Sequence, residues 1–187
     1  MRKLIFVLSL LLAAAAIAQD APKPAAPPAA QSETQAKPEA KAADVQSIDS
    51  ILAALYDVIS GPPGPRDWNR FHSLFIPGAR LIAVRKMPDG TVRQRVLTPE
   101  DYEKGSGAYF LKSGFFERGI HNTVDQFGQI AHVFSTYESR HEKDAQPFAR
   151  GINSIQLLND GKRWWVVSIL WDSERPDNPI PARYLEK

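Results

Sequence analysis

The fold class is decided by residues 164–171, whose sequence is WWVVSILW. Every residue of this stretch except Ser168 is apolar, so a strand formed by it is apolar on both faces. Such a strand needs cover on each side of its sheet. We expect helices on one side and a second subunit on the other. The stretch therefore predicts a sheet with helices packed on it and a homodimer formed through the sheet.

Three further strand-like stretches precede this one and predict an antiparallel meander. We expect the four strands at residues 115–127, 129–142, 148–159 and 163–172. Turn residues separate them at Gly128, at 143–147 and at 159–162, and connections this short join strands that are neighbours in space. The four strands should therefore lie side by side in chain order.

The first half of the domain predicts helices and one strand pair. The expected elements are a helix at 48–59, a short helix after Asp67, strands at 79–85 and 91–97, and a helix from Thr98. Apolar residues of the first segment recur at helical spacing, and Asp67 and Thr98 are capping residue types. Gly90 supplies the turn between the two strands. Together with the meander, these elements predict an α+β fold with an antiparallel sheet and about three helices.

The N-terminal residues predict an export signal. Residues 1–18 combine Arg2 and Lys3, an apolar run and the cleavage pattern Ala16-Ile17-Ala18. The apolar run is shorter than the roughly 20 residues that cross a bilayer. We expect cleavage before Gln19, which leaves no stable membrane anchor and delivers the protein to the periplasm or the exterior.

The next segment predicts a disordered linker. Residues 19–43 are rich in Ala and Pro and contain no aromatic residue, so they have too little apolar surface to form a core. The remainder, residues 44–187, is expected to form one domain. The chain contains no cysteine, which excludes disulfides, thiolate metal sites and cysteine nucleophiles.

The charge of the chain predicts no nucleic-acid partner. The formal net charge is +2, but Arg2 and Lys3 leave with the signal peptide, and 21 basic residues then balance 21 acidic ones. A neutral chain lacks the basic patch that binds nucleic acid. No metal-ligand spacing, phosphate-binding loop or dinucleotide motif occurs, so we expect no metal and no cofactor.

The order of the elements resembles the nuclear transport factor 2-like superfamily. The resemblance rests on three stretches: DWNRFHSLF at 67–75, FGQIAHVFSTYE at 127–138 and GKRWW at 161–165. It implies a cone, in which a curved sheet wraps around helices and encloses a central pocket, and often a dimer through the sheet. Some members are ketosteroid isomerases, scytalone dehydratase or polyketide cyclases, and others only bind, so the fold alone selects no function.

The resemblance to the isomerases leaves the catalytic base unfilled. Those members carry a carboxylate near the end of the first strand, where this chain has the hydrocarbon side chain of Ala83. Their oxyanion partner in the third meander strand matches Asn153, which can still donate hydrogen bonds. The Tyr of their first helix has no clean counterpart; Tyr56 lies near that position but displaced from it.

The resemblance to the dehydratases points to histidines. Those members use a His on a strand beside one that bears Asn, and His132 and Asn153 have roughly that relation. Strand alternation places His132 and Tyr137 on opposite faces unless a bulge intervenes, so the direction of His132 stays open. His121, in a polar strand stretch, either lines the pocket or is exposed.

The residues themselves suggest one polar pair. Asn153 shares a strand face with Ile155 and Leu157, and a buried amide must find partners. We hypothesise that Asn153 points into the pocket and bonds Tyr137 on the neighbouring strand or an oxygen of a ligand. Trp171, at the end of its strand, is the expected contact at the pocket mouth.

Three functions remain. The first is an exported small-molecule-binding or accessory domain with an apolar pocket and no identified reaction. The second is a lyase or isomerase that uses His132 or His121 with Asn153, and the third is a protein-interaction module with a filled cavity. The candidate ligand-binding residues are Tyr56, His121, His132, Tyr137, Asn153 and Trp171.

Overall fold

The computed structural model describes residues 38–185. The expected signal peptide, and the expected linker up to residue 37, lie outside these residues. The first helix, α1 (Ala42–Val45), begins two residues before the expected domain start, and Ala40 already packs against the core. Among the described residues, no helix is both long enough and apolar enough to cross a membrane.

Three longer helices follow where the sequence predicts them: α2 (Ile48–Ile59), α3 (Trp68–Ser73) and α4 (Pro99–Phe110). Each starts at a side chain that accepts a backbone N–H. The Asp67 carboxylate accepts from the Arg70 amide at 2.9 Å, and the Thr98 hydroxyl accepts from the Asp101 amide at 3.1 Å. These bonds satisfy amide groups that have no partner inside the helix, and so they fix where each helix begins.

Six strands form one sheet in the order β2-β1-β6-β5-β4-β3. Their bounds are β1 (Phe75–Lys86), β2 (Val92–Leu97), β3 (Phe116–Phe127), β4 (Ile130–Arg140), β5 (Ala149–Asn159) and β6 (Trp164–Ser173). The expected antiparallel meander is confirmed by the pairings from β3 through β6. β1 begins at Phe75, four residues before the expected start at Ala79.

One pairing corrects the expected topology. β1 and β6 run parallel, with Leu81 opposite Ile169 and Ala83 opposite Trp171, so the sheet is mixed rather than wholly antiparallel. Each hairpin of the meander reverses the chain, but no local signal relates the direction of β6 to that of β1. That relation depends on where the connection through α4 delivers the chain to β3, at the far edge of the sheet.

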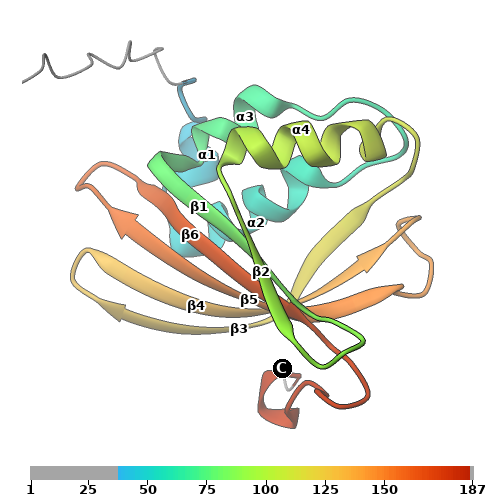
Figure 1. The fold of residues 1–187 in the computed structure, drawn as a ribbon. Coiled ribbons are helices and arrows are strands. Elements are labelled where there is room, and N and C mark those ends of the chain that lie inside the picture. The colour runs from blue at the N-terminus through green and yellow to red at the C-terminus, as the bar shows by residue number, and fades with distance from the viewer. Residues whose placement is uncertain (1–37, 186–187) are drawn as a thin grey trace, which may run out of the picture. The chain divides into compact units, whose positions relative to one another are not determined.

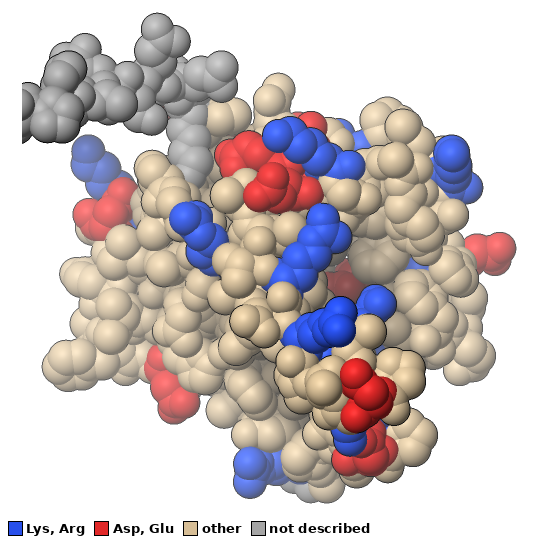
Figure 2. Space-filling view, viewed as in Figure 1, with Lys and Arg blue, Asp and Glu red and all other residues tan. Residues whose placement is uncertain are grey.

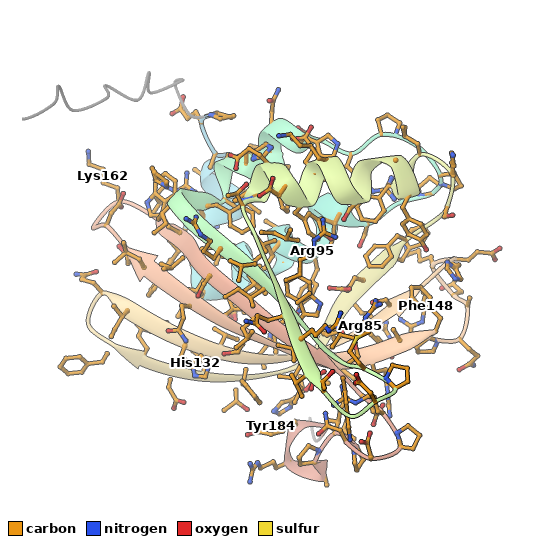
Figure 3. The ribbon with its side chains drawn as sticks, in the orientation of Figure 1. Arg85, Arg95, His132, Phe148, Lys162 and Tyr184 are labelled. Atoms are coloured by element: carbon orange, nitrogen blue, oxygen red, sulfur yellow. The ribbon has the colours of Figure 1, made fainter. Side chains whose placement is uncertain are left out.

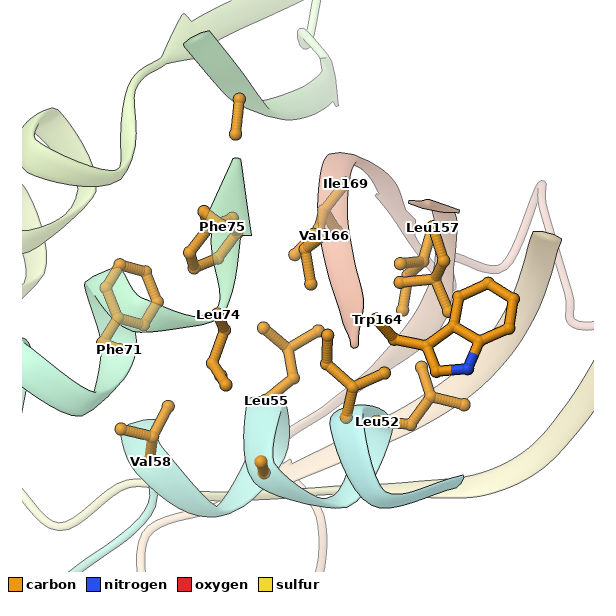
Figure 4. Packing of buried hydrophobic residues seen from close by; sticks show 14 of the residues in the cluster. Leu52, Leu55, Val58, Phe71, Leu74, Phe75, Leu157, Trp164, Val166 and Ile169 are labelled. Atoms are coloured by element: carbon orange, nitrogen blue, oxygen red, sulfur yellow. The ribbon is translucent and has the colours of Figure 1, made fainter. Parts of the chain in front are cut away.

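The sheet is open and strongly curved, and the helices gather on its concave face (Figure 1). The core lies between them. Leu52, Leu55 and Val58 of α2 pack with residues of α3, β1, β5 and β6 (Figure 4). Trp164, Val166 and Ile169 are the buried residues of β6 in this core.

The curvature of β6 includes a bulge that decides which of its residues face inward. Its register against β5 shifts between Gln156 and Leu157, where an extra residue enters β6. Trp164 and Val166 face the helices before the shift, and Ile169 is buried with them after it. The bulge therefore changes the phase of the strand and turns Trp171 toward the helices as well.

The C-terminal segment, residues 174–185, folds over the outer, convex face of the sheet (Figure 1). The Thr136 hydroxyl donates to the Tyr184 carbonyl at 2.7 Å, and the Phe134 and Tyr184 rings lie 5.1 Å apart. Asp177 forms an ion pair with Lys86 of β1. This segment, which includes η1 (Ala182–Tyr184), supplies part of the cover that the apolar outer face of β6 requires.

Candidate functional site

A pocket opens between the helices and the concave face of the sheet, with a volume of about 260 Å³. Figure 2 shows a hollow in this face, with acidic atoms at its depth and basic side chains beside it. Most of the wall is apolar. It is formed by Leu55, Tyr56, Ile59, Phe71, Leu81, Tyr102, Phe115, Glu117, Tyr137, Ser139, Phe148, Ala149, Asn153, Ile169 and Trp171. We call this cavity the Glu117 pocket, because Glu117 is the only acidic residue among the described residues that line it.

Glu117 is a carboxylic acid held in largely apolar surroundings. It lies on β3 opposite Ser139 of β4, whose hydroxyl donates to it at 2.8 Å. Burial raises its pKa from 4.5 to about 7, although hydrogen bonds from Ser139 and Asn153 oppose the rise. Near neutral pH both protonation states are populated, so Glu117 can donate or accept a proton.

Tyr56 joins the helix layer to the sheet beside this acid. Its hydroxyl lies 2.6 Å from the hydroxyl of Ser135, and the Asn153 amide donates to it at 3.1 Å. The Tyr56 hydroxyl thus accepts a hydrogen bond from Asn153 and shares a second one with the Ser135 hydroxyl. Burial raises the pKa of Tyr56, so its hydroxyl stays protonated. Asn153 also hydrogen-bonds Glu117, so these side chains form one connected polar cluster.

A glycine and a bulge in β3 leave room for Tyr56 to lie this close to the sheet. A Cβ atom at Gly119 would lie 3.0 Å from Tyr56 and 3.2 Å from Ser135, closer than ordinary contacts allow. The register of β3 against β4 then shifts between Gly119 and His121. The bulge keeps Glu117 and Gly119 on the pocket face and sends the rest of β3 into the opposite phase.

The structure brings together four of the six candidate ligand-binding residues. Tyr56, Tyr137, Asn153 and Trp171 all line the Glu117 pocket. They reach it from α2, β4, β5 and β6, so these four elements meet at one cavity.

The two histidines, whose directions the sequence left open, lie on the other face of the sheet, so neither shares the pocket with Asn153 as the lyase or isomerase alternative requires. His132 pairs with Gln156 and lies 3.0 Å from the Ser154 hydroxyl, both on the strand next to it (Figure 3). No bulge interrupts β4, so simple alternation holds and separates His132 from Tyr137. His121 follows the β3 bulge and pairs with Thr136, which faces the C-terminal segment.

The bond expected between Asn153 and Tyr137 is not formed. Asn153 bonds Tyr56, whereas the Tyr137 hydroxyl lies 3.3 Å from the Ser173 hydroxyl. A Cβ atom at Gly151 would lie 2.7 Å from the Tyr137 hydroxyl oxygen, so only glycine leaves room for this ring. Tyr56, a candidate from the first long helix, connects the cluster to the helices through its bonds to Ser135 and Asn153.

Four polar residues of the site were not predicted from the sequence: Glu117, Tyr102, Ser135 and Ser139. Glu117 precedes Arg118 in a strand whose residues are mostly exposed, so it resembles a solvated charge. Its position in the strand could have indicated burial. Phe115, Glu117 and Gly119 share one face because alternate residues of a strand do, and Phe115 and Gly119 favour burial or close packing. Tyr102 lies on α4, and burial raises the pKa of its hydroxyl.

A second, polar pocket adjoins the first. Tyr56 and Glu117 line both, and the wall of the second also includes charged residues such as Asp57, Arg118 and Arg140. Its volume is about 630 Å³. Glu117 is therefore accessible from a polar cavity on one side and faces an apolar cavity on the other. Within residues 38–185, no group of three or more His, Asp or Glu side chains could hold a metal ion.

Comparison with known proteins identifies the fold. No protein-family model and no curated protein sequence matches the chain significantly. A protein of unknown function with a cystatin-like fold from Nostoc punctiforme is 12% identical, covers 74% of this chain and 96% of its own length, and superposes with a TM-score of 0.53. A protein of the nuclear transport factor 2-like family from Streptomyces avermitilis, proposed to be a dehydratase, is 13% identical. It covers 71% of this chain and 96% of its own length, with a TM-score of 0.51.

These similarities show the fold and not the activity, because the identities are low. The chain has the nuclear transport factor 2-like fold that the sequence resemblance implied, with an α+β architecture and a curved open sheet.

Proposed function

We propose that the protein binds a small, mostly apolar molecule in the Glu117 pocket. The observation that carries the proposal is a cavity of about 260 Å³ left open inside a packed apolar core, with a polar cluster on one wall. Apolar cavities with a few converging polar groups are the usual form of small-molecule sites. An open cavity argues against the alternative of an interaction module filled by its own side chains. The signal-like residues 1–18 support a role outside the cytoplasm.

The polar wall suggests what the ligand carries. The neutral form of Glu117 donates a hydrogen bond, and the hydroxyl groups of Tyr102 and Tyr137 stay protonated because burial raises their pKa values. All three lie on the wall of the pocket. A ligand oxygen that accepts hydrogen bonds, such as a carbonyl, matches these donors.

Binding can be tested by filling the pocket. Octan-1-ol should bind the full chain with an affinity measurable by calorimetry, and Ala149→Trp should abolish binding because Ala149 lines the cavity. Ala108→Trp, on the exposed face of α4, is the matched control and should bind normally. Native mass spectrometry of protein from its host should also find a retained small molecule. Failure of the wild-type chain to bind either kind of molecule would contradict the proposal.

The acid itself favours a second, narrower candidate: proton transfer of the isomerase or lyase type. Ionised Glu117 removes a proton from a carbon next to a carbonyl, and the electron pair moves to the carbonyl oxygen, which a tyrosine hydroxyl stabilises. Glu117 then returns the proton to a second carbon, or to a leaving hydroxyl that departs as water. A pKa near 7 suits both halves of this cycle.

Proton transfer has a separate test. The wild-type chain should accelerate exchange of the hydrogens next to the carbonyl of cyclohexanone in D₂O, followed by NMR. Glu117→Gln should remove the acceleration, while Asp125→Asn, on an exposed part of the same strand, should not. Cyclohexanone bound without any acceleration by wild type would exclude this candidate and leave the binding function in place.

A further inference from the structure

Three arginines extend the wall of the Glu117 pocket past its mouth. Leu81 and Trp171 both line the pocket, and the register places Ala83 beside Trp171. Directly paired residues of adjacent strands share a face, and alternate residues of one strand do too. Arg85 follows Ala83 by two positions on β1, and therefore lies on the pocket face of the sheet.

The same register places two arginines of β2 on this face. Arg95 pairs with Ala83, and Arg93 pairs with Arg85. Figure 3 shows Arg85 and Arg95 extending from the two strands of this hairpin below α4. The neighbouring residues Val84 and Lys86 belong to the opposite face, where they meet the C-terminal segment. Arg85, Arg93 and Arg95 thus form a cluster on the pocket side, which we call the arginine rim.

The arginine rim has no acidic partner in the described chain. All three side chains are exposed, and none lies within ion-pairing distance of a carboxylate of residues 38–185. Asp101 on α4 acts on Arg95 only as a nearby charge, since its carboxylate caps the helix. Arg85 and Arg93 are like charges directly opposite each other, an arrangement that destabilises a strand pair. An anion bound between them would relieve this repulsion.

Protection of the edge strand accounts for only part of this arrangement. Charged residues do keep the edge strand of a sheet from pairing with other chains. Arg93 and Arg95 lie on the edge strand β2, where inward-pointing charges serve this purpose, but Arg85 lies on β1, which is paired on both sides.

We infer that the ligand of the Glu117 pocket is an amphipathic anion, whose apolar body occupies the cavity and whose anionic group lies on the arginine rim. This inference rests on the proposed binding function. Arg guanidinium groups bind carboxylates and phosphates through paired, charge-assisted hydrogen bonds, so either group has the required chemistry. Ala83 connects the two parts of the site through its strand partners, since it pairs with Trp171 of the pocket wall and with Arg95 of the rim.

Two probes of equal chain length test the inference: octanoate and octan-1-ol. Octanoate should bind the wild-type chain at least tenfold more tightly than octan-1-ol at low salt, because only octanoate carries a charge. High salt should reduce this preference and leave octan-1-ol affinity unchanged. Arg85→Gln and Arg95→Gln should each reduce octanoate affinity several-fold while octan-1-ol binds as before. Unchanged octan-1-ol affinity shows that the pocket of each variant is intact.

Lys162→Gln is the matched control, since it removes one positive charge from an exposed turn at the other end of the sheet (Figure 3). It should leave the octanoate preference unchanged. Equal binding of the two probes, or a preference that survives both arginine substitutions, would overturn the anionic ligand and leave the pocket proposal standing. Binding of neither probe would instead contradict the pocket proposal, and the inference with it.

Discussion

Glu117 gains hydrogen bonds from Ser139 and Asn153, but these do not fully replace the water that an ionised carboxylate loses on burial. The folded chain therefore favours the neutral form of this acid more than the unfolded chain does. A buried acid of this kind lowers the stability of the folded protein at any pH at which the acid must ionise. The retention of such an acid in an apolar wall is the residue-scale argument that the pocket has a chemical role.

The unfolding free energy of the protein should depend on the ionisation of Glu117. The pKa of Glu117 is 4.5 unfolded and about 7 folded, so its contribution is fully present below pH 4.5 and is lost as the pH rises through 7. Glu117→Gln cannot ionise. Relative to wild type, this variant should gain about 2–3 kcal/mol of unfolding free energy between pH 4.5 and pH 8. Urea denaturation at several pH values measures the difference, and a difference that stays constant with pH would show that Glu117 is not held neutral.

Asn153 should control the same titration. Asn153→Leu removes a hydrogen bond that lowers the pKa of Glu117, so that pKa should rise further. The variant also removes the amide donor to Tyr56 and should be about 1–3 kcal/mol less stable. NMR titration of the Glu117 carboxyl carbon measures the first effect and denaturation the second. Gln156→Leu, on the exposed face of the same strand, should change neither the pKa of Glu117 nor the stability. A pKa of Glu117 that is unchanged by Asn153→Leu would show that Asn153 does not interact with Glu117.

At the scale of the elements, two glycines have opposite roles. Gly119 lies where a Cβ atom would press on Tyr56 at 3.0 Å, whereas at Gly105 of α4 the nearest atom, on the Arg95 guanidinium, would be 3.8 Å away. Gly119→Ala should therefore destabilise the fold by about 1–3 kcal/mol through overpacking. Gly105→Ala should stabilise it by about 0.5–1 kcal/mol, because alanine is the better helix former. Thermal unfolding of both variants tests the pair, and a Gly119→Ala protein as stable as wild type would show that β3 is free to move away from Tyr56.

The bulges of β3 and β6 decide which residues of these strands face the Glu117 pocket. In β6 the inserted residue reverses the phase and brings Trp171 to the cavity, whereas in β3 the phase reverses only after Glu117 and Gly119 and turns His121 to the other face. Bulges also increase the local twist, which suits a sheet that curves around its helices.

At the scale of the whole molecule, we expect a homodimer formed through the outer face of the sheet. The C-terminal segment covers part of that face, but Phe127, Ile130 and Leu170 remain exposed. Light scattering at micromolar concentration should give twice the mass of one chain, and Leu170→Lys should shift it toward the monomer because a charge would be buried at the contact. A wild-type chain that stays monomeric at this concentration would contradict the dimer.

The sequence by itself determined the elements and the fold class. Caps at Asp67 and Thr98, the turn at Gly90 and the apolar pattern of 164–171 act within a few residues of the chain, so their effects can be predicted locally. The same local reasoning identified Tyr137, Asn153 and Trp171 as residues that would face one cavity.

The tertiary structure decided which residues of those elements face the same cavity. The parallel pairing of β1 with β6 follows from a connection across the whole domain, and the bulge at Gly119 removes His121 from the pocket face. Glu117 resembles a surface charge until α2 covers it, because burial is a property of everything packed around a residue. Its raised pKa, and with it the chemistry proposed for the pocket, comes from that desolvation, which depends on contacts between residues far apart in the chain.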